Sequence, residues 1–222
     1  MNPSDLLPYA VAGIAAYLLG AVPFGLLVAR IKGIDIRKVG SGNIGATNVF
    51  RSVGKGLGIL TFTLDVAKGY VPAKVFPWVA GLAGMDVDHS TMGVACGLLA
   101  VAGHNWPVYL GFKGGKGIAT SAGALLGFAP LATLVGLGTW AVVFGVTRYV
   151  SVGSIAACVA VAGGSWWLCP GSGTLVPVVL TLLGAVGVWR HRTNVRRLLD
   201  GTEHRFGRKK ETVCGQGEGE KS

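Results

Sequence analysis

Residues 6–29 read LLPYAVAGIAAYLLGAVPFGLLVA and contain no charged side chain. A helix needs about 20 apolar residues to cross the hydrocarbon core of a bilayer, and this stretch is long enough. It is too long for the apolar core of a typical signal peptide, and the residues before it include Asp5 and no basic side chain. The sequence therefore predicts a retained membrane-spanning helix at the N-terminus.

The whole chain of 222 residues shares this bias. Its charged residues amount to 14%, against about 25% in typical soluble domains, and its mean hydropathy is +0.56. So few polar side chains could not coat a water-soluble surface, which excludes a soluble globular domain, a disordered chain and a secreted disulfide scaffold. The net charge is nevertheless +10. The four scattered cysteines show no C-x-x-C motif and no metal-ligand spacing, so we expect no metal site at them.

The charges fall in blocks that indicate topology. Residues 30–55 hold six basic and one acidic side chain, a net charge of +5, and residues 190–210 hold eight basic and two acidic ones, a net charge of +6. Lys113, Lys116 and Arg148 are the other basic residues near the ends of apolar stretches. Because loops rich in lysine and arginine stay in the cytoplasm, we expect these segments and the C-terminus inside and the N-terminus outside.

This orientation requires an odd number of spans, and seven is our prediction. Pro130 would divide one apolar stretch, and a turn at residues 170–173 would divide another. Two full spans need roughly 40 residues, more than 118–147 offers, so five full spans plus a re-entrant pair is the alternative. The expected spans are 6–29, 57–80 and 91–112, with two each in 118–147 and 149–189.

Two smaller patterns concern packing within the bundle. Asp65 and Lys68 lie one helical turn apart in an apolar stretch, so we expect an intramembrane ion pair. The spacing of Gly93 with Gly97, and of Gly123 with Gly127, is typical of membrane helices that pack closely. We expect one transmembrane domain over residues 1–206 and a polar, disordered cytoplasmic tail over 207–222.

Three polar segments between the spans have the composition of binding sites. The first is Gly40–Arg51, GSGNIGATNVFR, whose glycines free the backbone to turn N–H groups toward a phosphate oxygen. Arg51 could close such a site with a bidentate contact. An ordinary flexible polar loop is the alternative.

The second segment combines GHNWP at residues 103–107 with GFKGGKG at residues 111–117. It fails the nucleotide-binding pattern G-x-x-x-x-G-K-[ST], because residue 110 is leucine and Gly117 stands where serine or threonine is required. Lys113 and Lys116 among three glycines would still form a compact anion cradle, unless the lysines serve only as topology signals. His104 is either a hydrogen-bonded structural histidine or a functional one.

The third segment is WRHRTNVRRLL at residues 189–199, followed by Glu203. A helix here would place His191 and Asn194 on one face. A basic helix lying on anionic lipid is the alternative, but it would not explain His191, Asn194 or Glu203.

Together the segments predict a site for an anionic, phosphorylated substrate with a lipid partner. No carboxylate pair, metal cluster or Ser-His-Asp arrangement stands out in the sequence, and no nucleic-acid partner is expected. A channel or transporter for organic phosphate anions would use similar basic, glycine-rich loops. A non-enzymatic lipid-binding scaffold would explain the basic C-terminal segment but not the glycines.

The three segments resemble, in order and spacing, the signature motifs of bacterial acyl-phosphate:glycerol-3-phosphate acyltransferases. The resemblance covers roughly residues 6–206 and includes GAVPFG at 20–25 and RYVS at 148–151. It implies a monomeric, multi-pass enzyme of the bacterial inner membrane. The enzyme would be a seven-helix bundle with a cytoplasmic active site and no cofactor. It also implies acyl transfer from acyl phosphate to the 1-hydroxyl of glycerol 3-phosphate, which gives lysophosphatidic acid and starts phospholipid synthesis.

Site residues follow from the motif positions. Candidate catalytic residues are Ser41, Asn43, Lys113, His191 and Asn194, and candidate substrate-phosphate-binding residues are Arg51, Gly114, Gly115, Lys116, Arg148 and Ser151. Glu203 is a weaker candidate. His191 is the best protein candidate for the base, because the unperturbed pKa of histidine is about 6.5, and a substrate phosphate is the alternative base. Thr193 stands where the family commonly has glutamate.

Overall fold

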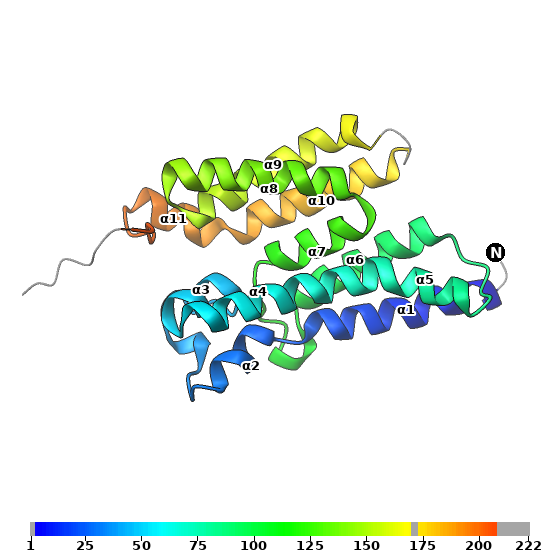
Figure 1. Cartoon of the computed structure of the whole chain (residues 1–222), viewed down its shortest axis with the longest axis horizontal. Coiled ribbons are helices and arrows are strands. Elements are labelled where there is room, and N and C mark those ends of the chain that lie inside the picture. Colours follow the sequence, from blue (N-terminus) through cyan, green and yellow to red (C-terminus); the bar gives the residue numbers. More distant parts are fainter. Residues whose placement is uncertain (1–2, 170–172, 208–222) are drawn as a thin grey trace, which may run out of the picture.

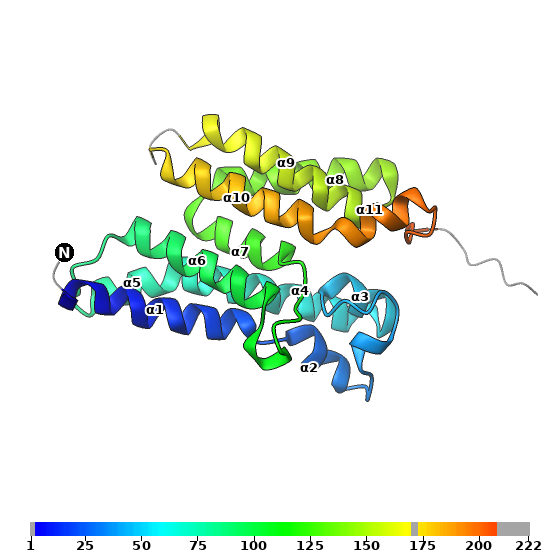
Figure 2. The same ribbon diagram turned by 180° about the vertical axis from the view of Figure 1, so that it is seen from behind.

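The computed structural model describes residues 3–169 and 173–207, and every regular element in these two ranges is helical. The long helices run side by side along one direction (Figure 1). One layer contains α1, α4, α5, α6 and α7, and the other contains α8, α9 and α10, as the view from behind also shows (Figure 2). The fold class predicted from the sequence, an all-α helical bundle, is thus confirmed for the described residues.

The first apolar stretch forms two helices, α1 (Pro3–Ala21) and α2 (Phe24–Arg30). Val22 and Pro23 separate them, because proline has no N–H to donate to the preceding turn. Leu6–Arg30 is still apolar and long enough to cross a membrane. α2 is followed by the 3-10 turn η1 (Ile36–Lys38) and by α3 (Ala46–Ser52).

The next helical rod is continuous but irregular. It consists of α4 (Lys55–Tyr70), a π-helical turn η2 (Val71–Val75) and α5 (Phe76–Leu82). The rod then turns back into α6 (His89–Asn105), whose first turn is capped by Asp88 through the backbone N–H groups of Ser90 and Thr91. A short 3-10 turn η3 (Val108–Leu110) leads toward α7 (Ile118–Phe128).

Glycines let these helices approach closely. A Cβ atom on Gly123 of α7 would overlap the carbonyl oxygen of Val66 on α4, and one on Gly93 of α6 would lie 2.6 Å from the carbonyl oxygen of Ala73. The close packing expected at these small residues is therefore confirmed.

The second layer begins at the predicted break. α7 ends at Phe128, and α8 (Pro130–Thr147) starts at Pro130, as we predicted. α9 (Val150–Leu168) and α10 (Leu175–Arg190) follow, and α11 (Arg192–Leu199) is bent from α10 by 47°. The turn expected at residues 170–173 lies mostly outside the described residues, as does the tail after Gly207.

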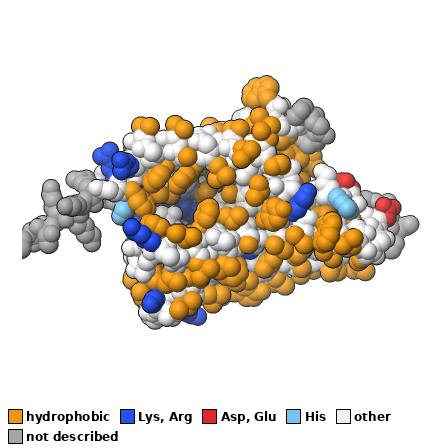
Figure 3. All heavy atoms as spheres, viewed as in Figure 1, with side chains coloured by type: hydrophobic (Ala, Val, Ile, Leu, Met, Phe, Trp, Pro, Cys, Tyr) orange, Lys and Arg blue, Asp and Glu red, His pale blue; other side chains and the backbone are white. Residues whose placement is uncertain are grey.

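Within the described ranges, three stretches are long and apolar enough to span a membrane: Leu6–Arg30, Pro130–Thr147 and Val150–Leu168. The bent pair α10–α11 would make a fourth, and α7 is a shorter apolar helix. Large apolar side chains cover the outside of these helices, including Trp167, which is 79% exposed, and Val146, which is 76% exposed (Figure 3). Such faces need an apolar environment.

A buried ionic cluster ties the first layer together. The Asp65 carboxylate lies 2.8 Å from the Lys68 ammonium, which confirms the predicted ion pair, and 3.7 Å from Nδ1 of His104 on α6. Lys68 also donates a 2.8 Å hydrogen bond to the carbonyl oxygen of Val22, at the break between α1 and α2. The cluster thus connects α4, α6 and the α1–α2 junction, with each of its three ionisable side chains at most 4% exposed.

Candidate functional site

The site is organised around Glu203, just after α11. Its carboxylate accepts hydrogen bonds from Ser151 Oγ on α9 at 2.8 Å, from Asn194 Nδ2 on α11 at 2.8 Å, and from Arg197 Nε at 2.9 Å. Asn194 in turn accepts a hydrogen bond from Lys116 Nζ, in the loop before α7. Three distant parts of the sequence therefore converge on one carboxylate.

Arg51, on α3, approaches the same cluster from the first glycine-rich segment. Its guanidinium carbon lies 4.7 Å from the centre of the Phe206 ring. Its Nε–H is buried and has no hydrogen-bond acceptor among the described residues. Because buried donors are nearly always satisfied, this N–H indicates a place where an external acceptor would bind.

The charges of the cluster shift its pKa values. Burial above all, together with the positive charges of Arg197, Arg51 and Arg190, lowers the pKa of Lys116 to about 8, although Glu203 counteracts this. Burial disfavours the ionised form of Glu203, but the hydrogen bonds from Asn194, Ser151 and Arg197 hold its pKa below the ordinary value. The site at neutral pH thus contains an ionised Glu203 among several cations.

The loop before α7 is held in place by Arg190, at the end of α10. Its Nε donates to the carbonyl oxygen of Gly115 at 3.0 Å, and its Nη2 donates to those of Gly114 at 2.9 Å and Asn105 at 3.3 Å. The Gly115 N–H donates to the His104 carbonyl oxygen at 3.1 Å. The Gly115 N–H is therefore engaged within the protein, whereas we had expected the backbone at Gly114 and Gly115 to bind phosphate.

The glycines of this loop have packing reasons of their own. A Cβ on Gly115 would overlap the imidazole of His104, and one on Gly114 would overlap the His104 carbonyl oxygen. Gly117 has a φ of +78°, and a Cβ there would lie 2.7 Å from Asn105 Oδ1. The absence of side chains lets the loop lie against the end of α6, which brings Lys116 toward Asn194.

We expect Gly117→Ala to lower the turnover of substrate by at least about tenfold, because both a left-handed strain of about 1–2 kcal/mol and a clash with Asn105 would displace Lys116. Gly111→Ala is the matched control: Gly111 also has a positive φ, +57°, but nothing lies near its missing Cβ. Its activity should fall less than threefold. Equal losses of activity in the two variants would show that the backbone strain, and not the clash with Asn105, causes the loss. The measurement is the initial rate of purified variants at equal folded concentration.

Asn48 organises the first glycine-rich segment. It is 4% exposed, and its Nδ2 donates to the carbonyl oxygens of Ile36, Val39 and Asn43 at 2.9–3.2 Å. Its Oδ1 accepts from the Ser41 N–H at 3.0 Å. Loop 36–45 is thus wrapped around one asparagine and differs from a flexible polar loop.

Among the predicted site residues, those that meet are Lys116, Asn194 and Ser151, with Arg51 close enough to act on Lys116 through its charge. His191, at the α10–α11 bend, is 2% exposed, and its Nδ1 lies 2.8 Å from the carbonyl oxygen of Gly187. These residues face one region at the end of the bundle where α3 and α11 lie (Figures 1 and 2).

The other predicted residues make more local contacts. Asn43 Oδ1 accepts from the Gly45 N–H at 2.8 Å, and Ser41 Oγ accepts from the Asn43 N–H at 3.4 Å. Lys113 is exposed, and within the described residues its backbone N–H donates to the Leu110 carbonyl oxygen at 3.3 Å while its side chain makes no hydrogen bond or ion pair. Arg148 is exposed too, and its carbonyl oxygen accepts the Phe206 N–H at 2.9 Å, which fixes the chain after Glu203. The roles predicted for these residues stay predictions.

Three important residues were absent from the predicted site: Asn48, Arg190 and Arg197. Asn48 and Arg190 donate hydrogen bonds to backbone carbonyl oxygens, and Arg197 donates one to the carboxylate of Glu203. The available signal was Glu203 itself, an acidic residue in a strongly basic segment, which indicates a specific partner. In residues 3–169 and 173–207, no group of three or more His, Cys, Asp or Glu side chains could hold a metal ion.

Fold and site together define a class, an integral membrane protein with a cluster of cationic and polar side chains at one end of a helical bundle. The family model described as glycerol-3-phosphate acyltransferase matches residues 10–201. The chain belongs to this family and is an acyltransferase.

Individual relatives agree with this assignment. The glycerol-3-phosphate acyltransferase of Methylobacillus flagellatus is 46% identical, over 90% of this chain and 98% of the relative, and that of Erythrobacter litoralis is 43% identical, over 90% and 96%. A similar solved structure is that of PlsY (YgiH), an integral membrane glycerol 3-phosphate acyltransferase. Its glycerol 3-phosphate form superposes with a TM-score of 0.79 and is 41% identical in sequence. The match covers 90% of this chain and 96% of that one. Its lysophosphatidic acid form gives a TM-score of 0.77.

Proposed function

We propose that the protein transfers a fatty acyl group from acyl phosphate to the 1-hydroxyl of glycerol 3-phosphate, giving lysophosphatidic acid and inorganic phosphate. The observation that carries this proposal is the pairing of two buried cationic groups, Arg51 and Lys116, with the polar side chains around Glu203. The solved relative has a glycerol 3-phosphate form and a lysophosphatidic acid form, both of which carry one phosphate.

The unsatisfied Nε–H of Arg51 suits a phosphate oxygen. A guanidinium binds phosphate through paired N–H donors, and Lys116 adds a point charge next to it. Two anionic substrates must lie side by side for transfer, so positive charge at this position would lower their repulsion and orient both of them.

An apolar groove supports a fatty acyl donor. It has a volume of about 100 Å³ and lies between α7, α8, α9 and α10. The groove is lined by Ile118, which is two residues after Lys116, and by Gly187, whose carbonyl oxygen contacts His191. It is also lined by Leu125, Trp140 and Leu180 farther into the bundle. A chain in this groove would have its phosphate end toward the cationic cluster.

In the proposed reaction, the glycerol hydroxyl oxygen attacks the acyl carbonyl carbon, and the bond from that carbon to the phosphate oxygen breaks. Phosphate leaves with the bonding electrons, and the hydroxyl proton passes to a base. Lys116 and the Asn194 amide are the donors best suited to stabilise the negative oxygen of the tetrahedral intermediate.

His191 has a ring nitrogen that can accept a proton in one tautomer, but burial, followed by the positive charge of Lys116, lowers its pKa to about 4, so it is a weaker base than the unperturbed histidine expected from the sequence. If Nδ1–H donates to the carbonyl oxygen of Gly187, Nε2 keeps its lone pair and can accept a proton. We expect His191→Ala to lower kcat by about 10²–10⁴-fold with a smaller change in KM. Gln would replace the ring without supplying a base, so His191→Gln should be as slow as His191→Ala. If either variant keeps most of the wild-type kcat, the proton passes to a substrate phosphate instead.

The pKa of Lys116, about 8, predicts an alkaline limit. Lysine is cationic below its pKa, so kcat/KM should fall by up to tenfold per pH unit above about pH 8 as Lys116 loses its proton. Lys116→Arg should remove this decline, since arginine stays charged. Rates measured from pH 7 to 10, corrected for spontaneous hydrolysis of acyl phosphate, test this. An unchanged decline in Lys116→Arg would assign it to another group.

The decisive experiment supplies purified protein in proteoliposomes with acyl phosphate and glycerol 3-phosphate. We expect lysophosphatidic acid and an equal amount of inorganic phosphate. Acyl-CoA and acyl carrier protein thioesters are the comparison donors. Activity with these thioesters alone would show that the acyl donor is a thioester and not acyl phosphate. Uptake of glycerol 3-phosphate without product would favour the organic-phosphate transporter.

We further propose one domain of seven spans in the bacterial inner membrane, with the N-terminus outside and the site at the cytoplasmic face. The distribution of basic residues supports this orientation, since 30–55 and 190–207 belong to the site's end of the bundle. A cysteine introduced at Lys38 should react with a membrane-impermeant thiol reagent in inside-out vesicles, and one at Asp86 should not. The opposite pattern would reverse the orientation.

A further inference from the structure

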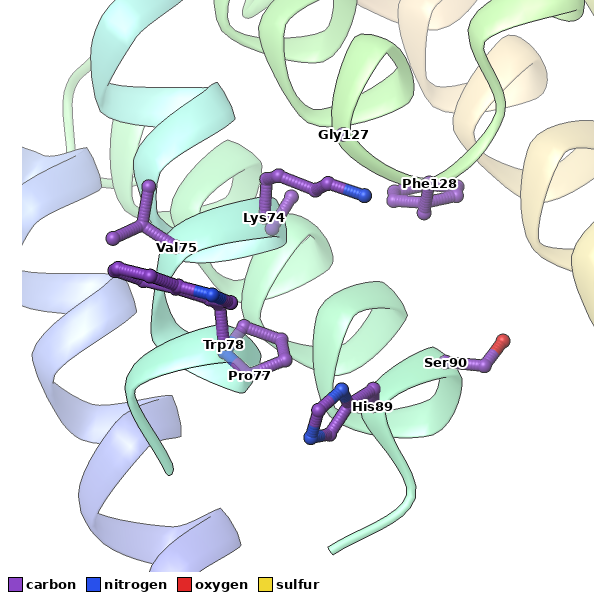
Figure 4. A pocket seen from close by; sticks show the side chains of 9 residues that line it. Lys74, Val75, Pro77, Trp78, His89, Ser90, Gly127 and Phe128 are labelled. Atoms are coloured by element: carbon purple, nitrogen blue, oxygen red, sulfur yellow. The ribbon is translucent and has the colours of Figure 1, made fainter. Parts of the chain in front are cut away.

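A second cavity lies in the half of the bundle away from Glu203. It has a volume of about 560 Å³ and is lined by residues of η2, α5, α6 and α7. Lys74, Trp78, His89, Ser90 and Phe128 surround it (Figure 4). None of them contacts the cluster around Glu203, so the cavity is separate from the proposed active site.

The cavity is built where the helical rod is irregular. Val71–Val75 form a π-helical turn, with Pro72 inside it and Pro77 just after it. π-helical turns inside α-helices are rare and frequently accompany functional sites. On the opposite wall, a Cβ on Gly127 would lie 2.8 Å from Ala73 Cβ, so the glycine lets α7 approach this turn.

Lys74 is the charged group of the cavity. Within residues 3–169 and 173–207 it forms no ion pair and no hydrogen bond, and its side chain extends along the cavity toward Phe128 (Figure 4). A lysine on an apolar helix of a membrane protein normally has a partner or a role. Because Lys74 is exposed at the cavity, its ammonium is accessible to an anion from outside the chain.

The remaining walls combine polar and apolar surface. Ser90 and the imidazole of His89 lie at the start of α6, whereas Pro77, Trp78 and Phe128 are apolar (Figure 4). The space-filling view shows a basic and a histidine side chain close together within a mainly hydrophobic face, with an acidic side chain next to the histidine (Figure 3). A ligand that fits must therefore carry negative charge next to hydrocarbon and must reach the protein from the membrane.

We propose that this cavity binds an anionic glycerophospholipid. Its phosphate would lie at Lys74, with His89 as a further hydrogen-bond donor, and an acyl chain would cover Trp78 and Phe128. Basic pockets between transmembrane helices on the cytoplasmic side bind anionic headgroups, and this cavity would use the same chemistry in the opposite half of the bundle. A soluble anion would leave the apolar wall unused, and a zwitterionic lipid would bring a positive group toward Lys74.

The test is native mass spectrometry of the detergent-solubilised full chain with phosphatidylglycerol or phosphatidylcholine at equal concentration. We expect one phosphatidylglycerol retained at least about fivefold more strongly than phosphatidylcholine. Lys74→Ala should lose this preference, and Lys74→Arg should keep it. The matched control is Lys55→Ala, an exposed lysine at the other end of the same rod, which should behave as wild type.

Trp78→Ala tests the apolar wall and should also weaken retention of phosphatidylglycerol. All four variants should keep wild-type acyltransferase activity, which shows that they are folded. Equal retention of the two lipids, or undiminished retention in Lys74→Ala, would overturn the proposal. Displacement of the lipid by millimolar inorganic phosphate would overturn it too, since the cavity would then bind a soluble anion.

Discussion

Replacing Lys116 with methionine should lower kcat/KM by at least about 100-fold, a loss of about 2.7 kcal/mol of transition-state stabilisation. The side chain is mostly buried, and its ammonium contacts Asn194 beside Glu203, so its charge acts where water screens it little. Methionine has a similar length and no charge. The loss should therefore appear in the kinetics of both substrates, measured by the formation of lysophosphatidic acid.

Lys32→Met is the control for this variant. Lys32 is an exposed lysine in the turn after α2, so the control removes the same charge from the protein without touching the cluster. It should retain activity within about twofold of wild type. If Lys116→Met loses less than about threefold, Lys116 does not contact the reacting groups, and the proposed anion site must lie elsewhere.

Lys68→Met should lower the free energy of unfolding by about 3–5 kcal/mol, because it leaves the Asp65 carboxylate buried without its ion-pair partner. It also removes the donor to the carbonyl oxygen of Val22, at the break between α1 and α2. The measurement is reversible unfolding in mixed micelles of mild detergent and sodium dodecyl sulfate.

The double variant Asp65→Asn with Lys68→Met separates the two causes. It removes both charges, so it should regain at least half of the stability lost in Lys68→Met. A double variant as unstable as the single one would show that the contact with Val22, and not the unpaired carboxylate, dominates. Acyltransferase activity should fall with the folded fraction in both variants.

Most of the fold could be predicted from local chemistry. The helix break at Pro130 follows from the missing N–H of proline, and the ion pair follows from the spacing of Asp65 and Lys68. The single helix expected over residues 6–29 was wrong, because Val22 and Pro23 divide it into α1 and α2. The π-helical turn at Val71–Val75 could not be predicted, because its side chains also suit a regular apolar helix. The length of α7 could not be predicted either, because it depends on the packing of α7 against α4 and α6.

The site could be predicted in its charged and polar members but not in how they are held. Lys116, Asn194 and Ser151 carry recognisable chemistry, and the structure brings them to Glu203. Arg190 looked like one more basic residue at a membrane boundary, yet it binds the carbonyl oxygens of Gly114 and Gly115. Backbone carbonyls have no sequence signature, so contacts to them are visible only after the chain has folded.

The contact of Arg51 with Phe206 has a consequence for biosynthesis. The two side chains are 155 residues apart in the sequence, and Glu203 lies almost as far from the first loop. At roughly 5–20 residues per second, the ribosome needs roughly 8–31 seconds between them. The early helices must therefore remain in the bilayer with an open, cation-rich end until the segment that contains Glu203 and Phe206 has been synthesised. A nascent chain halted before residue 203 should be inserted yet inactive, so synthesis cannot release a working enzyme before translation is nearly complete.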